Sequence, residues 1–222
     1  AGVASVLVLY RLVRRWRGET AGLVAALAFA LTPVTVLIFR YNNPDALLTL
    51  LLLLAAWAVW SALETGSTLR LALGGVALGS AFLTKMLMAF MVLPALVLAY
   101  GLFGAPRLGR RLLQLLVAAV ALLVSAGWWV ALVSLWPDGA RPHVGGTTAD
   151  SWLSLIFSRS AGVLDGAALG ANLSGPPGWL RVFNEQLGGQ VSWLLPLASV
   201  GLVAGLVMTC RAPRTDRRRA GY

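Results

Sequence analysis

Two charged residues, Arg40 and Asp45, bracket a short turn between long apolar runs, with the sequence Arg40-Tyr-Asn-Asn-Pro-Asp45. Pro44 suits the first turn of the helix that follows, and Asn42 or Asn43 is suited to cap it. A carboxylate such as Asp45 is stabilised near a helix N-terminus by the helix dipole. The turn therefore has a purely structural interpretation. A functional one stands beside it, in which Asp45 and a nearby arginine bind a polar or phosphorylated ligand.

Lys85 is the only lysine in a chain that contains 17 arginines, and apolar sequence lies on both sides of it. One interpretation is that its long side chain reaches the membrane surface from an apolar helix. The alternative is that its compact positive charge binds a phosphate, which is a common role for lysine. Because arginine is used everywhere else, the choice of lysine at this position favours the phosphate interpretation.

Two further polar residues, His143 and Glu185, lie in the longest polar segment of the chain. His143 is the only histidine, and a single histidine needs carboxylate partners before it can hold a metal ion. Glu185 comes just before the last apolar run, where capping or interfacial polarity explains it equally well. Both stay candidate substrate-binding residues. The sequence predicts no cofactor, although it leaves a divalent metal as an open alternative.

The elements that must position these residues are long apolar runs. Hydrophobic residues make up 59% of the 222-residue chain and charged residues 12%, which is about half the usual charged fraction of a soluble domain. We therefore expect an all-α, polytopic bundle of membrane helices with about seven membrane segments and one outer loop. The run at 71–84 is short, so it is either a tilted helix or half of a hairpin that turns at Lys85. The runs are 1–13 (incomplete), 20–39, 44–63, 71–84, 86–103, 112–136 and 191–210.

The distribution of charge predicts an orientation in the membrane. If the runs cross alternately, one side receives 13 of the 18 basic residues and three of the eight acidic ones, so the entire net charge of +10 falls on that side. Basic loops mark the cytoplasmic side of a membrane protein. Because the arginines cluster between apolar runs, nucleic-acid binding is not expected. The prediction is a multi-pass protein of a plasma membrane with loop 137–190 extracytoplasmic.

Several polar islands in the apolar sequence resemble those of a known enzyme family. Residues 40–51 and 79–87, which contain Asp45 and Lys85, resemble bacterial glycosyltransferase family 39. That family includes protein O-mannosyltransferase-like and aminoarabinose-transferase-like enzymes. Residues 125–131, 141–146 and 183–193 are similar to a subgroup common in actinobacteria. The resemblance covers nearly the whole chain, and the islands match in order and spacing.

The resemblance implies a C-type glycosyltransferase fold and a transferase that moves a mannose-like or related sugar. The donor would be a polyprenyl-phosphate-linked sugar, and the acceptor a protein, lipid or glycan on the outer face of a bacterial plasma membrane. Asp45 matches an acidic position near the active site, Lys85 a basic position that meets the lipid phosphate, and Arg40 matches more weakly. His143 stands where an aromatic residue is expected. The catalytic acid is expected upstream of Ala1, so no catalytic residue is named and the isolated chain is expected to be inactive.

The same resemblance divides the chain into three parts. Residues 1–136 would be transmembrane helices of the transferase core, with the first helix truncated. Residues 137–190 would form an extracytoplasmic loop with short interfacial helices, and residues 191–222 the last membrane helix and a basic cytoplasmic tail.

A membrane transporter or lipid flippase is the main alternative, with Asp45 and Lys85 as a substrate or proton site. A transporter would often show an internal repeat, and none is visible.

Overall fold

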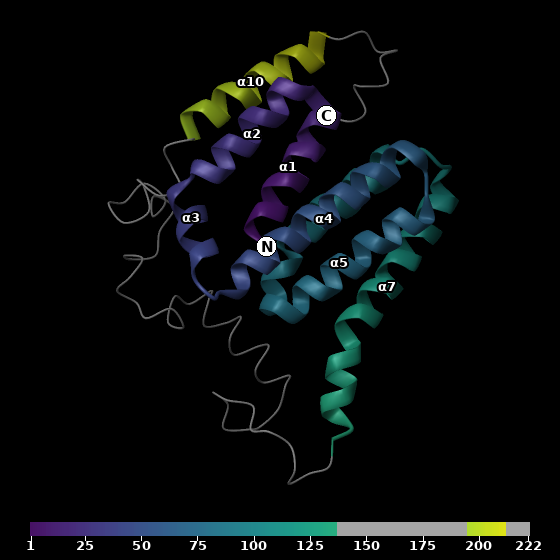
Figure 1. Ribbon diagram of the computed structural model, residues 1–222. Coiled ribbons are helices and arrows are strands. Elements are labelled where there is room, and N and C mark those ends of the chain that lie inside the picture. Colours follow the sequence, from purple (N-terminus) through teal and green to yellow (C-terminus); the bar gives the residue numbers. More distant parts are fainter. Residues whose placement is uncertain (137–194, 212–222) are drawn as a thin grey trace, which may run out of the picture.

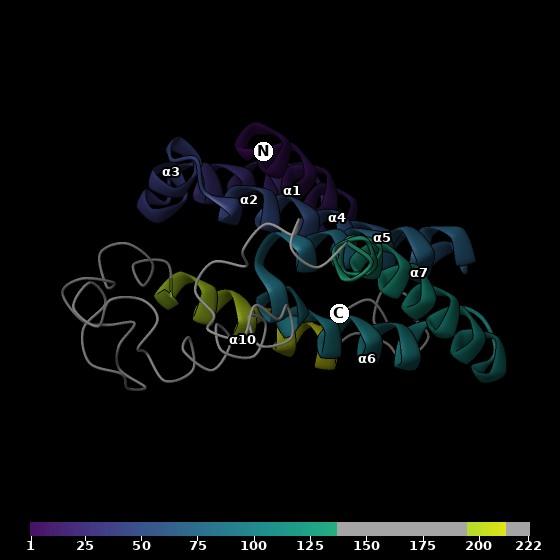
Figure 2. The ribbon, with the colours of Figure 1, turned by 90° about the horizontal axis from the view of Figure 1, so that it is seen from below.

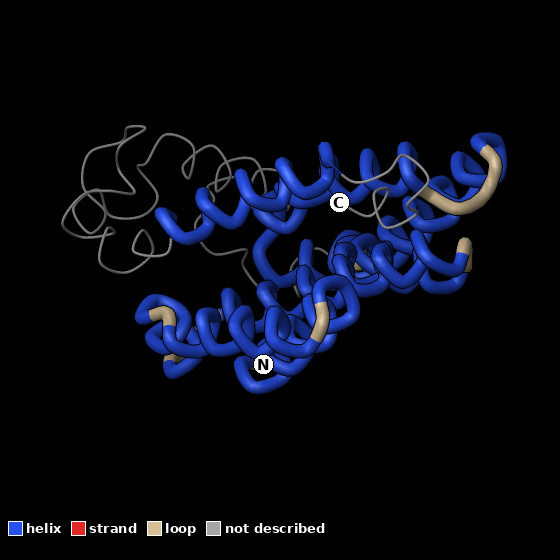
Figure 3. The backbone as a smooth tube through the Cα atoms, turned by 90° about the horizontal axis from the view of Figure 1, so that it is seen from above, coloured by secondary structure: helices blue, strands red, loops and turns tan. Residues whose placement is uncertain are grey.

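The structure, a computed structural model, describes residues 1–136 and 195–211. Within these ranges every regular element is a helix and no strand occurs (Figure 3), as expected from the sequence. The first four helices are α1 (Gly2–Arg17), α2 (Glu19–Leu31), α3 (Pro33–Arg40) and α4 (Pro44–Thr65). They are followed by α5 (Thr68–Lys85), the 3₁₀ helix η1 (Met86–Val92), α6 (Leu93–Phe103), α7 (Leu108–Ser134) and α10 (Leu195–Arg211).

Three apolar stretches are long enough to cross a membrane, namely Pro44–Thr65, Thr68–Phe103 and Leu108–Ser134. A fourth would be the bent pair α2–α3. The described helices thus support a polytopic membrane protein. The prediction of about seven segments goes beyond them, and it stays a prediction.

The apolar run at 20–39, expected as one segment, is broken between α2 and α3, whose axes differ by 63°. The break lies at Pro33, which has no backbone N–H and clashes with the preceding turn of a continuous helix. At this break the hydroxyl of Thr32 donates to the carbonyl of Ala28 at 2.6 Å, as expected for a residue that bonds back to its own helix. Pro33 could have predicted this break, but the continuous apolar run at 20–39 was interpreted as a single straight helix.

The stretch Thr68–Phe103 doubles back on itself, as the hairpin interpretation of Lys85 predicted. At 36 residues a straight helix would be about 54 Å long, well beyond the roughly 30 Å of a hydrocarbon core. Instead Tyr100 of α6 belongs to the same buried cluster as Leu71 of α5, together with Val59 and Ala62 of α4. The chain therefore turns through η1, and α6 returns beside α4 and α7 (Figure 2).

Helices α4, α5 and α7 form the centre of the bundle and lie side by side (Figure 1). Gly75 and Gly79 of α5 face α7 so closely that a Cβ on either would overlap the carbonyl oxygen of Ala118 or of Leu122. Small residues at helix crossings allow such approach in membrane proteins. The hydroxyl of Ser125 on α7 also donates to the carbonyl of Val76 at 3.0 Å.

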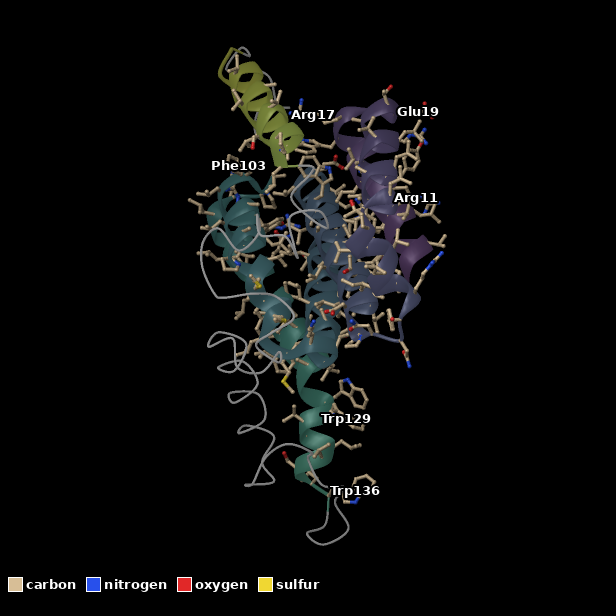
Figure 4. All side chains as sticks on the ribbon, turned by 90° about the vertical axis from the view of Figure 1, so that its left-hand side faces the viewer. Arg11, Arg17, Glu19, Phe103, Trp129 and Trp136 are labelled. Atoms are coloured by element: carbon tan, nitrogen blue, oxygen red, sulfur yellow. The ribbon has the colours of Figure 1, made fainter. Side chains whose placement is uncertain are left out.

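The turns of the bundle gather at two ends. Arg15 forms an ion pair with Glu64, and a Cβ placed on Gly66 would lie 3.3 Å from Pro106. These contacts join the α1–α2, α4–α5 and α6–α7 turns into one end, hereafter the arginine end. Figure 4 shows Arg17, Glu19 and Phe103 at this end and Trp129 and Trp136 at the other. Three of the basic segments predicted to share one side thus lie together, and the side of the membrane that they face stays a prediction.

Candidate functional site

Asp45 and Lys85 form an ion pair at the end of the bundle opposite the arginine end. Asp45 lies in the first turn of α4 and Lys85 at the last residue of α5. The two helices run antiparallel, so the start of one meets the end of the other although 40 residues separate them in the chain. The side chains are 23% and 35% exposed, respectively, so the pair is partly shielded but accessible.

Local sequence fixes the position of Asp45. Its backbone N–H donates to the side-chain oxygen of Asn43 at 3.1 Å, which makes Asn43 the N-cap of α4. Pro44 follows at the first helical position, where its missing N–H costs nothing. The hydroxyl of Thr49 donates to the Asp45 carbonyl at 2.8 Å. The carboxylate is therefore held at the positive end of the α4 dipole.

Lys85 is positioned by the way α5 ends. The backbone N–H of Met86 still bonds to the Phe82 carbonyl, but Met86 has φ 51° and ψ −136°. It is the only non-glycine residue with positive φ in the described part of the chain. Such strained backbone conformations persist where the surrounding structure holds them, and they cluster at functional sites. The change to the 3₁₀ helix η1 follows at once, so the Lys85 side chain leaves the bundle at a sharp break.

Helix α7 holds the C-terminal half of α5 in place. The hydroxyls of Ser80 and Ser125 lie 3.1 Å apart, and the hydroxyl of Thr84 donates to the Ser80 carbonyl at 3.0 Å. Since Lys85 is only five residues beyond Ser80, it lies about 7.5 Å further along the helix axis. The contact between α5 and α7 therefore determines where the ammonium group of Lys85 can reach.

A pair of exposed tryptophans lies at a similar level. α5 and α7 run parallel, and Gly75 meets Ala118 while Ser80 meets Ser125. The same offset places Lys85 opposite the stretch that contains Trp128 and Trp129, whose rings pack edge to face with centroids 5.6 Å apart. Tryptophan is enriched where a membrane helix reaches the interface. The ion pair accordingly lies near the depth of lipid headgroups.

The ion pair retains capacity to bind an anion. A lysine ammonium has three N–H donors and no acceptor, and Asp45 accepts one of them. The other two can donate to oxygens of a phosphate. Within the described ranges, no three His, Cys, Asp or Glu side chains come close enough to hold a metal ion.

The structure brings only two of the predicted site residues together. It brings Asp45 and Lys85 together, whereas Arg40 is exposed and forms no ion pair with any described residue. His143 and Glu185 lie outside the described residues. Sequence reasoning missed Ser125 and Met86. Ser125 lies in the stretch 125–131 that resembles the family, but its bond to α5 depends on a helix crossing. Nothing in the local sequence marks the positive φ of Met86.

Comparisons with known proteins bear directly on this geometry. The model of the family described as dolichyl-phosphate-mannose-protein mannosyltransferase matches residues 1–130, which include both members of the ion pair. The chain is 36% identical to "Putative mannosyltransferase YkcB" of Bacillus subtilis over 71% of this chain and 22% of that protein. It is 29% identical to "Putative mannosyltransferase YycA" of the same organism over 98% of this chain and 44% of that protein.

A third relative is the undecaprenyl phosphate-alpha-4-amino-4-deoxy-L-arabinose arabinosyl transferase of Pseudomonas paraeruginosa. It is 36% identical over 60% of this chain and 25% of that protein. The chain thus spans less than half the length of these curated relatives. No solved structure matches. Since the family model covers more than half of the chain, together with the helices that carry the Asp45–Lys85 pair, the chain belongs to the dolichyl-phosphate-mannose-protein mannosyltransferase family.

Proposed function

We propose that this chain forms part of an integral membrane glycosyltransferase that takes a mannose-like or related sugar from a polyprenyl-phosphate carrier. The observation that carries the proposal is the Asp45–Lys85 pair at the end of the α4–α5 hairpin. Two relatives support the transfer of mannose by their names, and the name of a third includes undecaprenyl phosphate. The acceptor would be a hydroxyl of a protein, lipid or glycan.

In this reaction the bond between the anomeric carbon and the phosphate oxygen breaks, and the acceptor oxygen bonds to the same carbon. The acceptor hydroxyl loses its proton to a general base. We assign this role to none of the described residues. Polyprenyl phosphate leaves with the electron pair of the broken bond. A fixed cation beside the leaving oxygen stabilises this developing charge. In the proposal Lys85 supplies that cation, and Asp45 orients its ammonium group.

The proposal includes an orientation. The Asp45–Lys85 end would face the extracytoplasmic side, because the arginine end carries the basic turns that usually stay in the cytoplasm. Arg40, which is exposed on the same turn as Asp45, is free to approach the donor phosphate as a second cation. His143 and Glu185 stay candidate substrate-binding residues on the same side.

The test measures binding of a polyprenyl phosphate and of the matching polyprenol to the purified chain in detergent. Wild type should prefer the phosphate, and Lys85→Met should reduce this preference roughly 10- to 100-fold, the range expected for a charge-assisted bond. Lys85→Arg should keep part of it. Arg11→Gln, which removes an exposed cation of α1 that belongs to neither proposed site, serves as the control. An unchanged preference in Lys85→Met would remove Lys85 from the donor site and leave the proposal without its supporting residue.

A further inference from the structure

The arginine end presents a dense positive surface. It contains Arg14, Arg15 and Arg17 of α1, Arg70 of α5, and Arg107, Arg110 and Arg111 around the start of α7. The acidic residues of these turns are Glu19 and Glu64. Seven positive and two negative charges give this end a net charge of +5. The ion pair of Arg15 with Glu64 and the contact of Gly66 with Pro106 bring the three turns together.

Two of these arginines have structural partners that leave their charge in place. Arg111 donates to the carbonyls of Pro106 and Gly101 at 2.6 and 2.9 Å, and so closes the C-terminus of α6. Arg70 donates to the hydroxyl of Ser61 at 2.7 Å. All of these acceptors are uncharged. The guanidinium groups are therefore fixed in position but not neutralised.

Arg107 and Arg110 have no such partner. Both are exposed, and neither side chain forms a hydrogen bond or ion pair with any residue in 1–136 or 195–211. The turn that carries them is rigid nevertheless. The amide of Gln114 donates to the Gly66 carbonyl at 2.9 Å and to the Thr68 hydroxyl at 2.8 Å, and its oxygen accepts from the buried hydroxyl of Tyr100 at 2.7 Å. Two unpartnered cations thus project from a turn held by a buried polar network.

The surface next to these cations is apolar. Leu108 and Leu112 are 68% and 63% exposed, and Leu69, beside Arg70, is 69% exposed. The rings of Trp16 and Trp60 pack edge to face at this end, with centroids 5.9 Å apart, as expected for aromatic residues at an interface. An acidic soluble protein would cover the cations but would leave the exposed leucines beside them in contact with water. A membrane leaflet covers both.

We propose that the arginine end is a binding surface for anionic phospholipid headgroups, with Arg107 and Arg110 as its main ligands. The headgroup phosphate would accept from their guanidinium groups, while its acyl chains lie against the exposed leucines of α7. Basic residues at a membrane surface are attracted to anionic lipids additively. The proposal is independent of sugar transfer, because the surface lies at the opposite end from Asp45 and Lys85.

The test measures lipid selectivity of the purified chain reconstituted in vesicles of phosphatidylcholine with phosphatidylglycerol. Spin-labelled phosphatidylglycerol or phosphatidylcholine is added in trace amounts, and the fraction immobilised by the protein is recorded. Wild type should favour the anionic probe, and Arg107→Gln with Arg110→Gln should reduce this selectivity by up to roughly 30-fold. Lysine at both positions should retain most of it, and Arg11→Gln, which removes an exposed cation of α1 outside both proposed sites, should leave it unchanged.

Three outcomes would overturn the proposal. The first is equal immobilisation of both probes by wild-type protein. The second is loss of selectivity in Arg11→Gln as large as in the double glutamine variant, because selectivity would then follow total charge and not this surface. Displacement of the anionic probe by soluble polyglutamate, but not by unlabelled phosphatidylglycerol, would instead assign the surface to an acidic protein. Circular dichroism of each variant checks that its helical content is retained.

Discussion

Replacing Gly79 by alanine should loosen the contact that positions Lys85. A Cβ at Gly79 would overlap the Leu122 carbonyl oxygen and would lie 2.8 Å from the Ser125 Cβ and 3.0 Å from the Ala126 nitrogen. Two of these atoms belong to the backbone of α7, so no side-chain rotation relieves the overlap. The helices must move apart, and overpacking of this kind typically costs about 1–3 kcal/mol. The close backbone contacts place Gly79→Ala near the upper end of that range.

Two further contributions set the net value. Separation of the helices lengthens the 3.1 Å contact between the Ser80 and Ser125 hydroxyls, and interhelical bonds in membranes average about 0.6 kcal/mol. Alanine is intrinsically more stable in a helix than glycine by about 1 kcal/mol, which partly offsets the loss. The expected decrease in the free energy of unfolding is therefore about 2–3 kcal/mol.

Gly127 provides the matched control, because it lies on α7 with open space around the position of a Cβ. Gly127→Ala should be neutral or stabilising by up to about 1 kcal/mol. The assay is unfolding by sodium dodecyl sulfate in mixed micelles, followed by circular dichroism. Gly79→Ala should thus lower the free energy of unfolding, and Gly127→Ala should not. Similar destabilisation by both, or no loss in Gly79→Ala, would refute the inferred α5–α7 contact.

Two other positions give sharp expectations in the same assay. Gln114→Leu strands the buried Tyr100 hydroxyl and the Gly66 carbonyl, so it should cost roughly 2–4 kcal/mol, whereas Tyr100→Phe removes one bond and should cost about 1 kcal/mol; equal losses would argue against the network. Because Met86 has φ 51°, Met86→Gly should be more stable than Met86→Ala by about 1 kcal/mol. The usual helix preference for alanine at this position would show that the strain is absent.

The sequence predicted the helical class better than it predicted the course of each helix. Asn43 capping α4 and the turn at Lys85 could be read locally, because caps and breaks depend on neighbouring residues. The break at Pro33 could also have been read there. By contrast, the buried bonds of Gln114 join residues 46 and 48 positions apart, and no local pattern specifies such a pairing. The Ser80–Ser125 contact was hidden for the same reason.

The turn after Lys85 explains why a lysine can occupy this position at all. If Thr68–Phe103 were a single straight helix, Lys85 would lie near its middle and place an ammonium group in hydrocarbon, at a cost of several kcal/mol. Because α5 ends at Lys85 and α6 returns toward the arginine end, the side chain instead emerges level with the start of α4. There its ammonium group donates a hydrogen bond to the Asp45 carboxylate. The strained Met86 backbone is the cost of that sharp ending. The hairpin also makes α5 and α7 parallel, so that their crossing at Gly79 and Ser125 fixes the position of Lys85 along the bundle.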